Sequence, residues 1–149
     1  MTLRRFLLKI DANFEKKLSN KFHDWNLDRI LSNSLEEIKG EHFYRISILI
    51  LGNFDLNVIN GFSAVLKNKK ESFQLKTTNK IPKESNINRD FIRKFMVLQE
   101  DIANKAYIDY TRLSKLVNKT DLDFYAWEVV SIALSNNISP LTAFSQLYK

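Results

Sequence analysis

The chain has 149 residues, of which 44% are hydrophobic, so it can bury the core of one domain and is not wholly disordered. It contains no cysteine, which excludes disulfides and thiolate zinc sites, and too few glycines and prolines for an all-β protein with many tight turns. A net charge of +6 and a pI near 9.5 indicate an anionic partner, and nucleic acid is favoured over a membrane surface because no basic amphipathic helix has a wide aromatic face.

Apolar residues recur at three- and four-residue steps through the first part of the chain, which predicts helices. The first helix is expected over residues 2–19, and a shorter second helix is expected to end near Ser32–Asn33. Ser34 and Glu37 have the spacing of a capping box. A third helix is therefore expected to begin there and to end at Gly52, because glycine is a common C-terminal stop.

A fourth helix is expected to begin with Asp55 as its cap and to carry apolar residues up to Leu66. Residues 67–87 are rich in Lys, Asn, Thr and Ser, which is typical of an exposed connector. From Lys67 to Lys94 the chain holds nine cationic and three anionic residues, a charge of +6 that equals the charge of the whole chain. A solubilising surface loop is the alternative to a binding segment.

Helical periodicity returns from residue 88, and a bend is expected near Glu100–Asp101. Asp121 or Asp123 is expected to cap the next helix. Ser139–Pro140 is expected to open the last helix, because proline suits the first helical position after a capping residue.

The predicted fold class is all-α, with seven to eight helices in two small bundles, 1–66 and 88–149, joined by the basic connector 67–87. No Gly-rich phosphate loop and no nucleophile elbow occurs. His23 and His42 each stand beside a carboxylate residue, but consecutive helical residues point about 100° apart, which disfavours a general-base pair. The chain is therefore expected to be non-catalytic and to bind no metal or cofactor.

The cationic residues are expected to form one outward-facing track for a sugar–phosphate backbone, without base-specific readout. Arg89 and Arg93 lie one turn apart at the start of a predicted helix, and Lys105 and Arg112 are expected to align on the next helical face. An ordinary solvated helix face is the alternative explanation. The predicted nucleic-acid-binding residues are Lys67, Lys69, Lys70, Arg89, Arg93, Lys94, Lys105 and Arg112.

Four aromatic residues distinguish the competing hypotheses. Phe73 and Tyr107 could stack on unpaired bases, although core packing is the favoured role for Tyr107. In the alternative hypothesis the chain is a helical interaction module, such as an immunity protein, adaptor or phage-encoded inhibitor, without nucleic-acid binding. That module would bind an acidic protein partner through exposed Phe144 and Tyr148. An unrecognised enzyme is the third hypothesis.

Three pieces of the chain carry a resemblance to a known family. The first is Glu41-His42-Phe43-Tyr44, which opens a predicted helix that ends at Leu51-Gly52. The second is the segment from Arg89 to Phe95, and the third runs from Leu116-Val117 through Asp121-Leu122-Asp123-Phe124 and Trp127 to Phe144 and Tyr148. In their order and spacing these pieces resemble the small subunit of type I-E CRISPR surveillance complexes, the Cascade small subunit, over residues 41–149.

This resemblance implies a non-catalytic, all-helical protein of two bundles. Its implied partners are crRNA, single-stranded or R-loop DNA, the other subunits of a multi-subunit effector complex, and copies of itself stacked head-to-tail, with no small-molecule substrate. The longest apolar run, Ile46–Leu51, is too short to cross a bilayer, so no membrane association is expected. The absence of cysteine fits a reducing compartment, and a cytoplasmic location is expected.

Overall fold

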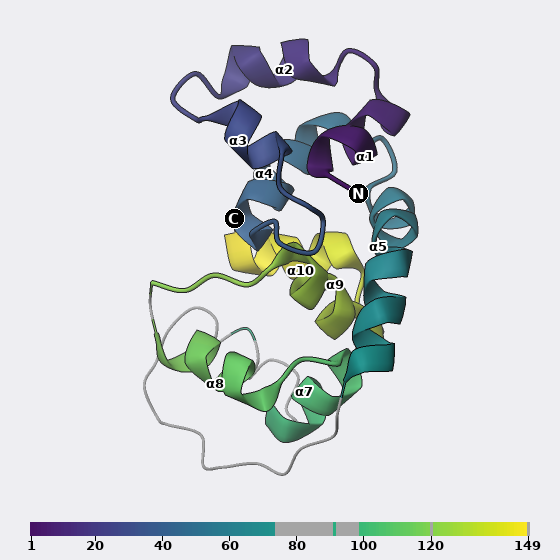
Figure 1. The fold of residues 1–149 in the computed structure, drawn as a ribbon, viewed down its shortest axis with the longest axis vertical. Helices are drawn as coiled ribbons and strands as arrows, with labels where there is room; N and C mark the ends of the chain where they lie inside the picture. Colours follow the sequence, from purple (N-terminus) through teal and green to yellow (C-terminus); the bar gives the residue numbers. More distant parts are fainter. Residues whose placement is uncertain (74–90, 92–98, 120, 149) are drawn as a thin grey trace.

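The computed structural model describes residues 1–73, 91, 99–119 and 121–148, and within these ranges the chain forms helices and no β-strand (Figure 1). The all-α prediction is confirmed. Two isolated β-bridges, Thr2–Ser34 and Lys39–Tyr125, are also present. The described helices are α1 (Leu3–Ile10), α2 (Phe14–Lys21), α3 (Leu27–Leu31), α4 (Gly40–Ile50), α5 (Phe54–Ser72), α7 (Gln99–Ala106), α8 (Tyr110–Asn118), α9 (Ala126–Ser135) and α10 (Pro140–Tyr148).

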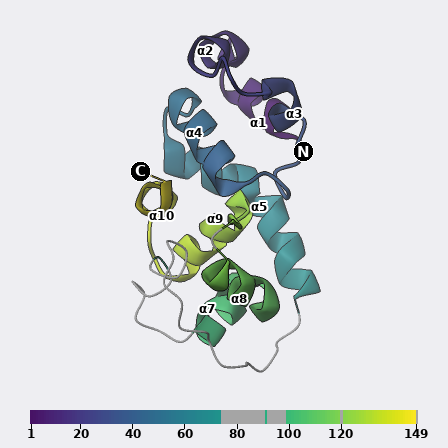
Figure 2. The same ribbon diagram turned by 90° about the vertical axis from the view of Figure 1, so that its left-hand side faces the viewer.

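The molecule is elongated, with α1, α2 and α3 at one end and α7 and α8 at the other (Figures 1 and 2). Helix α5, which has 19 residues, runs along one side and connects the two ends. Helix α9 lies in the middle and packs against α4, α5, α7 and α10. The central position of α9 links the two halves of the chain.

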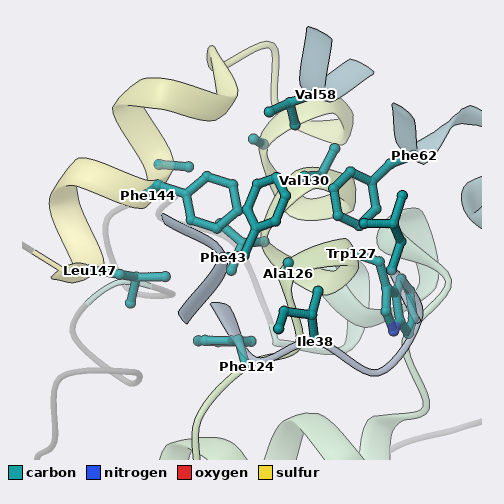
Figure 3. Packing of buried hydrophobic residues seen from close by; sticks show 14 of the residues in the cluster. Ile38, Phe43, Val58, Phe62, Phe124, Ala126, Trp127, Val130, Phe144 and Leu147 are labelled. Carbon is teal, nitrogen blue, oxygen red and sulfur yellow. The ribbon is translucent and has the colours of Figure 1, made fainter. Parts of the chain in front are cut away.

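One hydrophobic cluster takes residues from both halves of the sequence. At its centre Phe43 of α4 lies between Phe62 of α5 and Phe144 of α10, with ring centroids 5.1 Å and 5.6 Å away (Figure 3). All three rings are fully buried, and burial of such large apolar side chains is a main source of stability. The predicted division into two bundles is not confirmed, because helices from both predicted bundles share this core.

The predicted first helix over residues 2–19 is in fact two helices, α1 and α2. The chain leaves the helical path at Asp11, whose carboxylate accepts a hydrogen bond from the Asn13 N–H at 2.9 Å and pairs with Lys17. A short acidic side chain that bonds nearby backbone competes with the helix in this way. The hydrogen bond from Lys17 lowers the pKa of the Asp11 carboxyl group.

The prediction that Ser34 opens a helix is wrong. Ser34 forms the bridge to Thr2, and its carbonyl oxygen accepts the N–H groups of Glu37 and Ile38 in a turn. Helix α4 begins only at Gly40. The capping-box spacing therefore marks a single turn here, because tertiary backbone hydrogen bonds, from the Leu35 N–H to the Met1 carbonyl and from the Ala126 N–H to the Ile38 carbonyl, hold its two sides.

Helix α7 begins at Gln99, and residues 92–98 before it lie outside the described residues, so the predicted bend near Glu100–Asp101 stays a prediction. The chain turns at Tyr107, which has a left-handed φ of 59° that costs a non-glycine residue about 1 kcal/mol. Two contacts hold this turn. The Ser131 hydroxyl donates to the Ala106 carbonyl at 2.5 Å, and the Asp109 side chain caps α8.

Asp123, predicted as a possible cap of the helix that follows it, instead caps a helix distant in sequence. Its carboxylate accepts the Glu41 N–H at the start of α4, at 3.1 Å, and the Tyr148 hydroxyl, at 2.5 Å. Helix α9 is capped by Glu128, whose carboxylate accepts the Tyr125 N–H at 2.8 Å. Asp123 therefore joins the start of α4 to the end of α10.

Asp55 has the same long-range role at the other end of α10. Its carboxylate accepts the Leu141 N–H at 2.8 Å, while Asn53 caps α5 by accepting the Leu56 N–H. Ser139 accepts the Thr142 N–H in front of α10, as predicted for Ser139–Pro140. Helix α5 extends through Ser72, so the first part of the predicted connector 67–87 is helical.

Candidate nucleic-acid interface

A cleft of about 490 Å³ lies where the end of α5, the α7–α8 turn and the start of α9 meet. Its lining combines aromatic rings with both signs of charge. The aromatic lining residues are Phe73, Tyr107, Tyr125 and Trp127. Sequence reasoning had identified Phe73 and Tyr107 but not the other two, because nothing in the spacing of Tyr125 and Trp127 indicates that α9 meets α5 here.

Phe73 and Tyr107 contact each other edge to face, with ring centroids 5.9 Å apart. Phe73 directly follows α5, and Tyr107 directly follows α7, so the fold brings two helix ends together. Both side chains are partly buried and line the cleft. The core role favoured for Tyr107 is therefore wrong, since its ring is only partly buried and lines the cleft.

Three cationic side chains lie over aromatic rings around this cleft, an arrangement that is attractive because a ring face carries negative charge density. The pairs are Lys69 over Trp127 with the Nζ atom 4.8 Å from the ring centroid, Lys70 over Tyr107 at 6.0 Å, and Arg112 over Tyr125 with the Cζ atom at 4.6 Å. Each pair joins residues from different elements, so sequence spacing could not predict it.

Arg112 is bound to a buried carboxylate. Its guanidinium donates to both Glu128 carboxylate oxygens, at 2.9 Å and 3.1 Å, and to the Asp123 carbonyl at 2.9 Å. Glu128 is 1% exposed. Burial raises the pKa of Glu128, and the hydrogen bonds from Arg112 oppose that rise and favour the ionised form. A phosphate that displaced Glu128 would leave a buried charge unpaired, which disfavours Arg112 as a phosphate contact.

Lys69 is also engaged within the protein. Its ammonium group lies 2.5 Å from the Glu36 carboxylate, and the Lys69 side chain is 26% exposed. Together with the position of Lys69 over Trp127, this ion pair fixes the side chain against the cleft wall. Lys69 and Arg112 thus hold the cleft together, in contrast to the free cationic track expected from the sequence.

Lys67 and Lys70 are exposed on the last turns of α5, and Lys105 is exposed on the last turn of α7. Within the part of the chain that the structure describes, none of the three forms an ion pair. The predicted alignment of Lys105 with Arg112 is wrong, because the turn at Tyr107 separates their helices. The remaining predicted residues, Arg89, Arg93 and Lys94, lie outside the described residues.

The aromatic anchors expected in the alternative hypothesis are not at the surface. Phe144 is fully buried and Tyr148 is 9% exposed. Phe144 belongs to the central aromatic cluster, and Tyr148 donates its hydroxyl proton to Asp123. The prediction that these two side chains are exposed is therefore wrong, because α10 turns its aromatic face toward α4 and α5.

Among the described residues, no group of three or more histidine or carboxylate side chains could hold a metal ion. None of the described helices has the length and apolar character that a membrane span requires. No protein-family model, curated protein or solved structure matches the chain. The resemblance to the Cascade small subunit stays a prediction, and a function must be argued from the cleft and its surroundings.

Proposed function

We propose that the chain is a non-catalytic protein that binds single-stranded nucleic acid. In this proposal bases stack on Phe73 and Tyr107, and phosphates contact Lys67, Lys70 and Lys105. The observation that carries it is the meeting of Phe73 and Tyr107 in a cleft beside Lys70. Stacking of a base on an aromatic side chain contributes about 1–3 kcal/mol and tolerates every base.

The charge of the adjoining sequence supports this proposal. Phe73 is followed by a stretch, 74–98, that holds six cationic and two anionic residues. Each phosphate that such cations neutralise releases condensed counterions, which is the main source of sequence-independent affinity. The prediction for Arg89, Arg93 and Lys94 in this stretch stays untested and is part of the proposal.

The resemblance to the Cascade small subunit adds a proposed setting for this binding. In that setting the single strand is crRNA or the displaced DNA strand, and the chain is one subunit of an RNA-guided effector complex with copies of itself as neighbours. Binding of a free single strand does not require that setting. The two proposals can therefore be tested separately.

The binding proposal is tested by reversing the three exposed charges beside the cleft. The variant Lys67→Glu/Lys70→Glu/Lys105→Glu is compared with the parent by fluorescence anisotropy, using labelled oligothymidylate and oligouridylate of about 15 nucleotides. We expect the affinity to fall at least about tenfold at low salt. The slope of log K against log salt concentration should become less negative by about two, because each lost single-strand phosphate contact reduces the magnitude of that slope by ~0.7.

A matched control makes the same charge change at the opposite end of the molecule. Lys9, Lys16 and Lys21 are exposed on α1 and α2, and Lys9→Glu/Lys16→Glu/Lys21→Glu alters the net charge equally. We expect this control to lose much less affinity. Equal losses in the two variants would mean that the parent binds through its overall charge and not at the cleft.

A second candidate function is the helical interaction module, and one observation favours it. Ile48 and Leu49 at the end of α4, and Leu56 and Ile59 at the start of α5, are between 37% and 55% exposed. Exposed apolar side chains on neighbouring elements often mark protein contacts. A pull-down that retains one acidic protein after nuclease treatment, and loses it in Ile48→Lys/Leu56→Lys, would support this function.

A further inference from the structure

The lining of the cleft beside Phe73 and Tyr107 carries more negative than positive charge, whereas the exposed side chains of Lys67 and Lys70 on the neighbouring helix are cationic. Its lining contains four carboxylates and two cations, and each of these cations is paired with one of the carboxylates. The four carboxylates are Glu36, Glu37, Asp109 and Glu128. A phosphate is disfavoured in such a space, whereas a neutral group that donates N–H hydrogen bonds is favoured.

We infer that this cleft accepts one unstacked base of a bound strand and that the Glu37 carboxylate selects guanine, an inference that rests on the proposed function. The cleft volume of about 490 Å³ falls in the range of about 300–1,000 Å³ that is typical of small-ligand sites. It therefore has room for a purine. Exposed Lys67 and Lys70 on the neighbouring helix would hold the phosphates outside it.

Glu37 is the carboxylate best placed to select a base. Glu36 pairs with Lys69, Glu128 pairs with Arg112, and the Asp109 carboxylate accepts the Thr111 N–H in the first turn of α8 at 2.9 Å. Glu37 is exposed, and no ion pair involves it among the described residues. It lines the cleft with a carboxylate whose two oxygens accept hydrogen bonds.

Guanine matches this acceptor better than the other bases. Its Watson–Crick edge presents two adjacent donors, the N1–H and the N2 amino group, which can bond the two carboxylate oxygens side by side. Cytosine and adenine present one amino group beside an acceptor nitrogen, and thymine and uracil place their single N–H between two acceptor carbonyls. A two-bond match of this kind discriminates between bases by about 1–3 kcal/mol at a base edge.

The sequence alone predicted binding without base readout, and this inference adds a preference at one position of the strand. Stacking on Phe73 and Tyr107 remains common to all bases. Only the hydrogen bonds to Glu37 depend on which base enters. The preference should therefore be separable from binding itself.

The test uses the full chain and oligothymidylates of about 15 nucleotides with one central base replaced by guanine, adenine, cytosine or hypoxanthine. We expect the guanine oligomer to bind about five- to tenfold more tightly than plain oligothymidylate. Hypoxanthine, which lacks the N2 amino group, should lose most of that gain. Glu37→Gln should abolish the guanine preference, so that the variant binds the guanine oligomer and plain oligothymidylate with affinities within about twofold of each other.

Glu71→Gln is the matched control, because Glu71 is exposed on the last turns of α5 and does not line the cleft. It should keep the guanine preference. Equal binding of guanine and thymine oligomers by the parent overturns the inference, and so does an equal effect of the two glutamine variants. Absence of binding to every oligomer instead overturns the proposed function itself, so the two failures are distinguishable.

Discussion

The Tyr148 hydroxyl donates a 2.5 Å hydrogen bond to the Asp123 carboxylate, which links the last turn of α10 to the segment before α9. The second oxygen of the same carboxylate accepts the Glu41 N–H at the start of α4. One carboxylate therefore connects three elements that lie far apart in the sequence.

Replacing Tyr148 with phenylalanine should destabilise the fold while retaining most of the ring packing. The variant leaves a partly buried carboxylate oxygen without its donor, so we expect the free energy of unfolding to fall by about 1–3 kcal/mol. Thermal unfolding followed by circular dichroism measures the change. Tyr44→Phe is the control, because its 3.2 Å hydrogen bond with Ser145 is longer and should matter less.

The same hydroxyl should make stability depend on alkaline pH. Burial, reinforced by the negative charge of Asp123, raises the pKa of Tyr148 above its ordinary value of 10.0. Because the pKa of Tyr148 is higher in the folded state than in the unfolded state, the protonated hydroxyl gives its full stabilisation below the unfolded-state pKa. This stabilisation is lost as the pH rises above the unfolded-state pKa. Denaturant unfolding from about pH 8 to about pH 11 should therefore show a steeper loss for the parent than for Tyr148→Phe. Parallel curves would contradict the prediction.

Removal of Arg112 should leave Glu128 as an unpaired buried charge. We expect Arg112→Met to lower the free energy of unfolding by about 3–5 kcal/mol at neutral pH. Burial already raises the pKa of Glu128, and loss of Arg112 raises it further, so the carboxyl group is protonated more easily in the folded variant. Because the pKa of Glu128 is then higher in the folded variant than in its unfolded state, protonation of Glu128 stabilises the folded variant as the pH falls. Arg112→Met should therefore regain stability relative to the parent between about pH 7 and about pH 5.

A double variant tests whether this cost comes from the orphaned charge. Arg112→Met/Glu128→Gln removes both charges and should be more stable than Arg112→Met alone at neutral pH. The double variant should also show no gain of stability relative to the parent as the pH falls. Urea unfolding of the parent, the single variant and the double variant at the two pH values provides the comparison. If the single and double variants were equally unstable, lost packing would explain the effect instead.

The glycines offer a graded test of close packing. A Cβ atom on Gly61 would overlap the ring of Phe6, where α5 lies against α1, whereas a Cβ atom on Gly52 would meet nothing within 4 Å. We expect Gly61→Ala to cost about 1–3 kcal/mol through overpacking and Gly52→Ala to change stability by less than about 0.5 kcal/mol. Chemical denaturation of both variants measures the difference. A neutral Gly61→Ala would show that α1 shifts freely on α5.

The aromatic pair in the cleft can be tested without a change of charge. Phe73→Leu should weaken binding of oligothymidylate at least about fivefold, because a stacked base contributes about 1–3 kcal/mol. Phe22→Leu is the control, since Phe22 is also partly buried but stacks on Trp25 away from the cleft. Anisotropy titrations of the two variants should differ clearly. Equal affinities would exclude Phe73 as a stacking residue.

Local patterns predicted much of the secondary structure because helical periodicity depends on nearby residues. The end of the third predicted helix at Gly52 and the opening of the last helix at Ser139–Pro140 agree with α4 and α10. The errors arose where local signals and tertiary contacts compete. Ser34 has capping-box spacing but pairs with Thr2, and Asp123 precedes one helix but caps another.

At the candidate site, residue type alone predicted even less of what each side chain does. Lys69, Lys70, Phe73, Tyr107 and Arg112 were all identified from residue type, but their roles differ in the structure. Two of the cations bind the protein's own carboxylates, because the fold brings Glu36 and Glu128 beside them. No spacing along the chain indicates those pairings.

Composition and periodicity by themselves determined that this chain is helical and strongly basic and has no cysteine chemistry, since these properties depend on residue type and near neighbours. Only the tertiary structure decided which cations remain available, which aromatic rings stay accessible, and that the two halves share one core. The physical reason is that ion pairing and burial depend on distances between residues far apart in the sequence. Packing sets those distances when α9 docks against α4, α5, α7 and α10.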